Sequence, residues 1–271
     1  MSSSSVNSHF YHIPKTGGRS IISAFGEFNY PNMNLSTEDM YGFIVDTIKS
    51  CGTTDSSSLY IDGFNGITFG SKFLTFGHIP YHKVFSVIES HENRTSYWKN
   101  KGVSIIGSPS PNREQMESCC SFTVARDPIS RTFSYYKEYL EELSRDNVTT
   151  SIHELSPKSD SELSERKEWT FEDFIKALPN ERKVEQVYYF SKTFDVNEAI
   201  ENIEKLSSVV ICEKNKKGIS SISKHIGLDL KVPHGFSRNS SYKISKREME
   251  FARKELALEY DFYKVLYERY A

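Results

Sequence analysis

The stretch HFYHIPKTGGRSIISAFGEF, residues 9–28, decides the fold. Residues 9–13 are aromatic and β-branched and end at a proline, which predicts a short buried strand. Residues 20–28 carry apolar side chains at a helical spacing (Ile21, Ile22, Phe25 and Phe28). Between these two segments lies a loop with one lysine and two adjacent glycines. A strand, a loop and a helix in this order are typical of α/β folds.

The rest of the chain repeats this alternation. Residues 72–79, 119–125 and 207–213 are predicted strands, each next to a helical segment along the chain. Asp127 and Pro128 are suited to the N-cap and first turn of the helix that follows the second of these strands. We therefore predict a three-layer α/β fold, with a parallel β-sheet flanked by helices on both faces.

The 271 residues are predicted to form a single domain over 1–271. Residues 1–8 are expected to be disordered, and residues 46–71, rich in serine, glycine and threonine, are expected to be loop. The stretch 144–168 is polar and poor in aromatic residues, which predicts a polar loop or an insertion. Capping boxes are predicted where helices begin, at Thr170 with Asp173 and at Ser245 with Glu248.

Composition restricts the class of protein. The net charge of −2 gives no overall basic field that would favour nucleic acid. No apolar run reaches the roughly 18 residues of a membrane-spanning helix, and the first residues lack the order of a signal peptide. Four cysteines are too few for a disulfide scaffold, and the adjacent Cys119 and Cys120 favour a reducing compartment. We therefore expect a cytoplasmic protein without a membrane segment.

The loop of the opening stretch suits an anion. It consists of Pro14, Lys15, Thr16, Gly17, Gly18, Arg19 and Ser20. Glycines let the backbone approach a ligand, and the start of a helix adds unpaired N–H donors. Lys15 adds a full positive charge, so the loop is predicted to bind a phosphate or a sulfate. The phosphate loop of nucleotide triphosphatases has its lysine after the glycines, so this loop does not match it. An ordinary turn with a solvated lysine remains the alternative.

A second stretch, VARDPISRTFSYY (124–136), also follows a predicted strand. Arg126 stands at the carboxyl end of that strand, and Ser134 follows a little over two helical turns later. An arginine can bind a phosphate with two N–H groups while a serine hydroxyl donates from the helix. Taken alone, the stretch could also be a helix cap with a surface arginine.

Together, HIPKTGG and RDPISRTFSYY resemble the motifs of sulfotransferases that use 3′-phosphoadenosine 5′-phosphosulfate (PAPS). The resemblance is closest to the carbohydrate O-sulfotransferase branch (heparan sulfate 2-O/6-O-sulfotransferase-like). It implies a P-loop-like sulfotransferase fold in which the first loop holds the 5′-phosphosulfate, while Arg126 and Ser134 hold the 3′-phosphate. The chain departs from the family pattern at Arg19, where the family commonly has threonine or serine.

Sulfuryl transfer requires in-line positioning, charge stabilisation at the leaving oxygen and a base. Lys15 is the candidate for stabilising the leaving oxygen, and no metal is needed. His78, at the end of the strand over 72–79, is the candidate base, and the resemblance also favours it. A structural histidine is the alternative. His82 is the second choice and is assigned to the acceptor side. A zinc site of both histidines is disfavoured, because Pro80 lies between them and no third ligand is evident.

Two weaker features complete the predicted site. Arg238 and Ser240 resemble, by position, the family's late loop over the 3′-phosphate side of the nucleotide, although a plain linker is equally open. Gln186 and Tyr188 are predicted to line the acceptor cleft, and a tyrosine-rich amphipathic helix is the alternative.

The sequence thus predicts a PAPS-dependent sulfotransferase that acts on a hydroxyl of a carbohydrate or a small molecule. A nucleotide-dependent phosphotransferase and a non-catalytic nucleotide-binding module of the same fold are the alternatives. A catalytic domain of the Golgi lumen without its anchor is the alternative to a cytoplasmic enzyme. The acceptor and the oligomeric state stay open.

Overall fold

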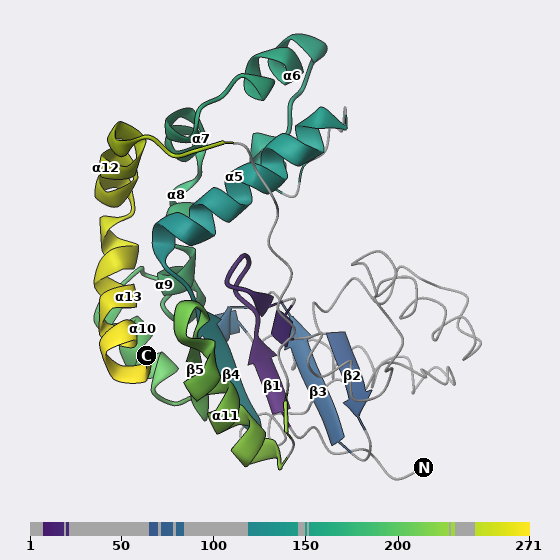
Figure 1. Cartoon of the computed structure of the whole chain (residues 1–271), viewed down its shortest axis with the longest axis vertical. Coiled ribbons are helices and arrows are strands. Elements are labelled where there is room, and N and C mark those ends of the chain that lie inside the picture. Colours follow the sequence, from purple (N-terminus) through teal and green to yellow (C-terminus); the bar gives the residue numbers. More distant parts are fainter. Residues whose placement is uncertain are drawn as a thin grey trace, which may run out of the picture.

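A computed structural model of the chain describes residues 8–18, 20–21, 65–69, 72–77, 80–83, 119–145, 150, 152–227, 229–230 and 242–271. A five-stranded sheet with the order β2-β3-β1-β4-β5 lies at its centre (Figure 1). The strands are β1 (Ser8–Tyr11), β2 (Asn65–Phe69), β3 (Lys72–Gly77), β4 (Cys120–Ala125) and β5 (Ser208–Ile211). Neighbours among β3, β1, β4 and β5 are parallel, whereas β2 pairs antiparallel with β3. The predicted α/β fold with a parallel sheet is confirmed.

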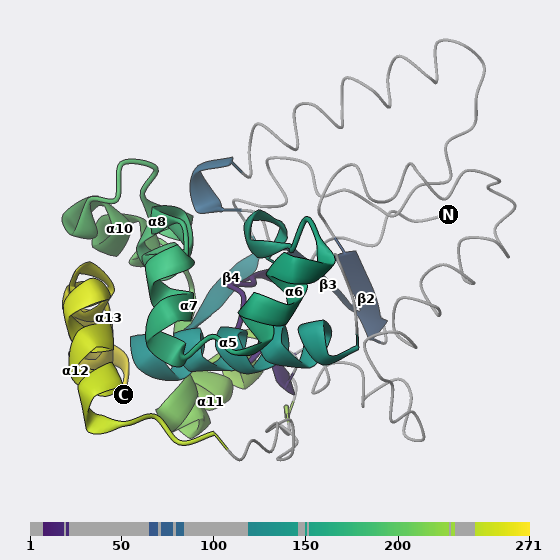
Figure 2. The same ribbon diagram turned by 90° about the horizontal axis from the view of Figure 1, so that it is seen from above.

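Most of the described helices follow β4 in the chain. They are α5 (Pro128–Ser144), η1 (His153–Leu155), α6 (Asp160–Lys167), α7 (Phe171–Ala177), α8 (Asn180–Lys183), α9 (Glu185–Phe190), α10 (Val196–Ile203), η2 (Cys212–Lys214), α11 (Asn215–Ile226), α12 (Lys246–Glu255) and α13 (Ala257–Tyr270). The long helix α5 leads away from the sheet towards α6 and α7 (Figures 1 and 2).

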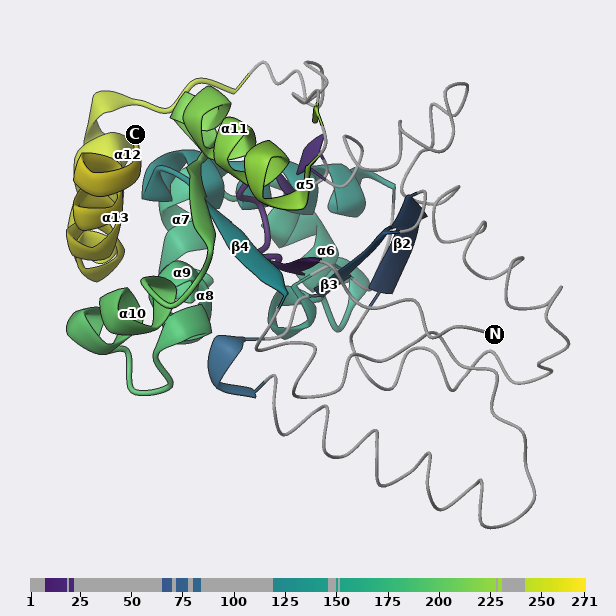
Figure 3. The same ribbon diagram turned by 90° about the horizontal axis from the view of Figure 1, so that it is seen from below.

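Alternate residues of the strands face opposite helical layers, as the two-residue period of a strand requires. Phe10, Phe122 and Val210 pack against α11 on one face. Tyr11 and Val209 pack against α9, α10 and α13 on the other face. Figure 3 shows α11 on one side of β4 and β5 and α9 and α10 on the other. The sheet is therefore the middle of three layers, and its strand ends lie between two sets of helices.

A third apolar cluster lies outside this sandwich and holds the far end of α5. Tyr136 and Tyr139 of α5 pack there with Phe171 and Phe174 of α7 and with Ala252 of α12. The predicted capping boxes start two of these helices, since Thr170 and Ser245 each accept a bond from the residue three positions on. The cluster fixes α5, whose first half lies beside the loop after β1.

Two expectations about the first third of the chain are corrected. Ser8, expected to be disordered, begins β1 and is fully buried, because it pairs with β3 and β4 on either side. Residues 65–69, within the segment expected to be loop, form β2. Strand β2 is an edge strand beside β3, and its pairing rather than its own composition makes it a strand.

The expected loop over 144–168 contains η1 and the helix α6. Helix α6 has no buried residue, so an apolar pattern could not reveal it. Its charges explain its formation: Ser159 caps its N-terminus, acidic residues occupy the first turn, and basic residues occupy the last turn. Arg166 also pairs with Glu162 one turn before it.

Candidate functional site

The two motifs meet at the carboxyl ends of the parallel strands. The loop after β1 and Arg126 after β4 follow neighbouring strands, and η2 follows β5 at the same edge. The hydroxyl of Thr123 donates to the carbonyl of Tyr11 at 2.8 Å and ties the ends of β1 and β4 together. Ligands of parallel α/β sheets bind at this edge.

The loop Pro14–Gly18 has an unusual backbone. Lys15 has a φ of 65° and Gly17 a φ of 97°, both in the left-handed region that few residues other than glycine adopt. Thr16 is fully buried, and its hydroxyl donates to the carbonyl of Ile13 at 2.9 Å. The N–H of Ser20 donates to the carbonyl of Gly17 at 3.1 Å. The threonine hydroxyl therefore shapes the turn, and Thr16 has only its backbone N–H to offer a ligand.

A close contact excludes a side chain at Gly18, and at Gly17 the left-handed backbone together with a tight contact disfavours one. A Cβ atom on Gly18 would lie 2.0 Å from Nε2 of His12, and one on Gly17 would lie 3.2 Å from Sγ of Cys212. The ring of His12 stacks on Phe10, so it cannot move away freely. Burial raises the pKa of Cys212, which makes it a packing thiol. Gly17 thus lies close to Cys212, which follows β5, and Gly18 lies close to the ring of His12.

A direct hydrogen bond joins the two motifs. Nη1 of Arg126 donates to the carbonyl of Lys15 at 2.9 Å, across 111 residues of sequence. This bond uses one of the five N–H donors of the guanidinium. The predicted phosphosulfate loop and the predicted 3′-phosphate arginine are therefore in direct contact.

The Lys15 ammonium lies against helix α5. It forms an ion pair with the carboxylate of Glu138 and lies 5.5 Å from the ring centre of Tyr135. The side chains of Lys15 and Glu138 are 19% and 9% exposed. Ser134 is half-buried on the same helix, one turn before Glu138. Sequence reasoning missed Glu138, although its spacing of four residues from Ser134 places both on one helix face.

A buried ionic cluster lies behind Arg126. The guanidinium of Arg131 is completely buried and contacts carboxylate oxygens of Glu185 at 3.0 Å and of Glu259 at 2.9 Å. Burial alone would lower the pKa of Arg131, but Glu259 and Glu185 hold it above its ordinary value. The hydroxyl of Tyr135 donates to Glu185 at 2.9 Å. This cluster links α5 to α9 and α13.

Gln186 joins this buried cluster to the backbone of Arg126, and its prediction as a residue that lines the acceptor cleft is corrected. It is fully buried, and its amide Oε1 accepts from the Arg126 N–H while Nε2 donates to the Arg126 carbonyl, both at 2.9 Å. Its own N–H donates to Glu259 at 2.8 Å. The amide therefore holds the backbone of Arg126 in place and is not available to an acceptor.

The predicted acceptor-side residues His82 and Tyr188 touch each other. Their rings are 5.2 Å apart at 73°, and the ammonium of Lys83 lies 5.6 Å from the Tyr188 ring centre. Neither ring nitrogen of His82 has a hydrogen-bond partner among the residues that the structure describes. Burial, followed by the nearby Lys83 and Lys192, lowers the pKa of His82, so the imidazole is neutral near pH 7.

Four predicted site residues lie outside the described part of the chain: Arg19, His78, Arg238 and Ser240.

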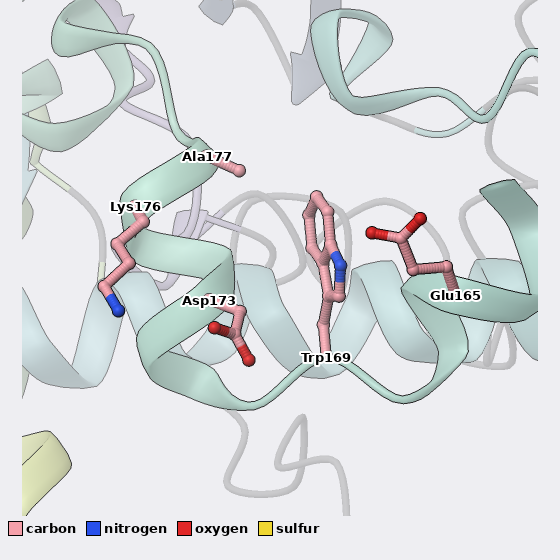
Figure 4. A pocket seen from close by; sticks show the side chains of 5 residues that line it. All are labelled: Glu165, Trp169, Asp173, Lys176 and Ala177. Carbon is pink, nitrogen blue, oxygen red and sulfur yellow. The ribbon is translucent and has the colours of Figure 1, made fainter.

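A hollow seen in Figure 4 lies elsewhere, along α6 and α7, and is lined by Glu165, Trp169, Asp173, Lys176 and Ala177. None of these is a predicted site residue, and Asp173 already accepts bonds from Thr170 in the capping box. Of the helices described, none is long and apolar enough to cross a membrane.

Comparison with known proteins identifies the class. The family model described as "Sulfotransferase family" matches residues 7–270, and the chain therefore belongs to the sulfotransferase family. No curated protein matches the chain. The matched region includes both motifs, and membership implies an enzyme that transfers a sulfuryl group to an acceptor.

Proposed function

We propose that this enzyme transfers the sulfuryl group of PAPS to a hydroxyl of a carbohydrate or a small molecule. The observation that carries the proposal is the bond between Arg126 and the Lys15 carbonyl. It joins the guanidinium of Arg126 to the backbone of Lys15, so that two residues with cationic side chains, from motifs distant in sequence, lie together at this edge of the sheet. Two cationic groups on one rigid frame suit a ligand with two anionic groups, as PAPS has. The family typically uses this donor.

The donor is assigned to the two motifs residue by residue. Lys15 and the backbone of Thr16, Gly17 and Gly18 hold the 5′-phosphosulfate, because a loop with left-handed residues before a helix suits backbone N–H groups to an anion and Lys15 adds a positive charge. Arg126 and Ser134 hold the 3′-phosphate, in line with the resemblance. Arg126 contacts this loop, and Ser134 lies one helical turn before Glu138, which pairs with Lys15. Arg19, Arg238 and Ser240 are proposed as further donor contacts.

The transfer itself needs a base and a stabilised leaving group. The acceptor oxygen bonds to sulfur as the bond from sulfur to the phosphate oxygen breaks, and 3′,5′-ADP leaves. Lys15 stabilises the charge on the leaving oxygen, and the acceptor proton passes to a histidine. His78 is the proposed base. It follows directly on β3, whose carboxyl end lies beside that of β1.

The acceptor is proposed to contact His82 and Tyr188. An aromatic ring beside a neutral imidazole and the ammonium of Lys83 suits a polar, hydroxyl-bearing ligand with an apolar face, such as a sugar ring. The carbohydrate O-sulfotransferase branch is therefore the proposed branch of the family. The adjacent cysteines Cys119, which is buried, and Cys120, which is half-buried, favour a reducing compartment, and we propose the cytoplasm.

A transfer assay tests the proposal. The enzyme is incubated with PAPS and a panel of sugars and small hydroxylated compounds, and both 3′,5′-ADP and the sulfated product are measured. We expect stoichiometric formation of the two with at least one acceptor and loss of transfer in Lys15→Ala. Lys83→Ala, which removes a lysine on the acceptor side, serves as the comparison and is expected to alter acceptor KM more than donor KM. Binding of 3′,5′-ADP without transfer to any acceptor would favour a non-catalytic module.

A further inference from the structure

We propose that Glu138 competes with the donor for the ammonium of Lys15. In the structure the carboxylate of Glu138 pairs with the ammonium of Lys15, and the 5′-phosphosulfate must take this ammonium over. This inference rests on the proposed role of Lys15 in donor binding. It explains why a carboxylate lies in a site built to receive anions.

The surroundings of the pair make the contact strong. Both side chains are largely buried, so water screens their attraction little. The ring of Tyr135 lies beside the ammonium, and the Tyr135 hydroxyl is fixed by Glu185. The cluster of Arg131, Glu185 and Glu259 in turn fixes that part of α5. Glu138 is therefore held by a rigid helix and not by a mobile loop.

The exchange requires movement of the lysine side chain alone. The carbonyl of Lys15 is bound by Arg126, and the next residue, Thr16, is anchored to Ile13, so the loop backbone stays in place. A lysine has a flexible stem and three rotatable donors, which allow its ammonium to move between two anions. If the ammonium stayed on Glu138, an anion that bound nearby would be repelled by the buried carboxylate of Glu138.

The ion pair of Lys15 and Glu138 has a consequence for which anions the site selects. With Lys15 neutralised, a small anion such as inorganic phosphate must displace Glu138 without help from the rest of the site. A nucleotide with a 3′-phosphate gains contacts at Arg126 and Ser134 and can offset that cost. Glu138 thus favours the intact donor and its product over simple anions.

The test compares two nucleotides that differ only at the position facing Lys15. The dissociation constants of 3′,5′-ADP and of adenosine 3′-phosphate, which lacks the 5′-phosphate, are measured for the native enzyme and for Glu138→Gln. We expect Glu138→Gln to bind 3′,5′-ADP about tenfold more tightly, a size typical of coupled binding events, with adenosine 3′-phosphate unchanged. The matched control is Glu141→Gln, which removes a carboxylate paired with Arg145 on the same helix and should change neither constant.

An unchanged ratio of the two constants, or a weaker affinity for 3′,5′-ADP in Glu138→Gln, would overturn the inference. The second result would make Glu138 a residue that positions Lys15 for the donor. If Glu138→Gln does not fold, Glu138→Asp serves instead, because the shorter side chain draws the carboxylate away from Lys15 and should shift the ratio in the same direction. Native enzyme that does not prefer 3′,5′-ADP to 5′-ADP would instead contradict the proposed function itself.

Discussion

Arg126 has two tasks, and the binding of two different nucleotides to one Arg126 variant can separate them. It holds the Lys15 carbonyl and is proposed to bind the 3′-phosphate. Loss of the first contact affects every nucleotide, whereas loss of the second affects only those with a 3′-phosphate. The difference between 3′,5′-ADP and 5′-AMP, which lacks only the 3′-phosphate, therefore reports the second task alone.

Arg126→Ala should weaken binding of 3′,5′-ADP about 10- to 100-fold more than binding of 5′-AMP, the size of a charge-assisted hydrogen bond. Titration calorimetry measures both affinities. Arg145→Ala, at the far end of α5, is the control and should leave both unchanged. Equal losses for the two nucleotides would remove Arg126 from the 3′-phosphate.

The two histidines make different predictions. His78→Ala should lower turnover by roughly 10²- to 10⁴-fold while nucleotide affinity stays nearly unchanged, as the loss of a base predicts. His82→Ala should act on acceptor KM instead. The reverse pattern, with turnover lost only in His82→Ala, would make His82 the base. Its lowered pKa then keeps it in the proton-accepting form at neutral pH, and activity would fall only in acid, below the ordinary histidine pKa of about 6.5.

At the scale of elements, α9 is the support of the strand end that carries Arg126. Its Gln186 bonds both the N–H and the carbonyl of Arg126, and it is completely buried. Gln186 was predicted to line the acceptor cleft from the position of its segment in the sequence, with a tyrosine-rich amphipathic helix as the alternative. Only the tertiary structure shows that the amide faces inward.

Gln186→Leu should cost about 1–3 kcal/mol of stability, because two backbone groups of Arg126 lose their partner. Thermal unfolding should show a midpoint lower by several degrees in the absence of any ligand. Gln186→Glu keeps one acceptor for the Arg126 N–H but loses the donor, and should also destabilise. A loss of activity with unchanged stability in both variants would return Gln186 to the acceptor side.

Some elements were predictable and others were not, for identifiable reasons. Strands β1, β3, β4 and β5 were predicted because they are short apolar runs, and the helices at Thr170 and Ser245 because their caps are local. Helix α6 was missed because it buries no residue, and β2 because its neighbour determines it. Local signals are visible in one sequence, whereas pairing across the chain is not.

At the scale of the whole molecule, the parallel sheet brings the two motifs to one edge, as the alternation of strands and helices predicts. The side-chain contacts around the two motifs could not be predicted from the sequence. Glu138 resembles any charge on an amphipathic helix until α5 is placed across the loop of Lys15. The buried cluster of Arg131, Glu185 and Glu259 likewise joins three helices that are distant in sequence.

The most direct test of the central claim is thermal unfolding of the protein alone, with 3′,5′-ADP and with 5′-ADP. A ligand at about 100 times its dissociation constant should stabilise the fold by roughly 2.7 kcal/mol, a shift of several degrees. If the two motifs form the proposed donor site, we expect this shift with 3′,5′-ADP and little or none with 5′-ADP. A preference for 5′-ADP, or no shift with either nucleotide, would contradict it.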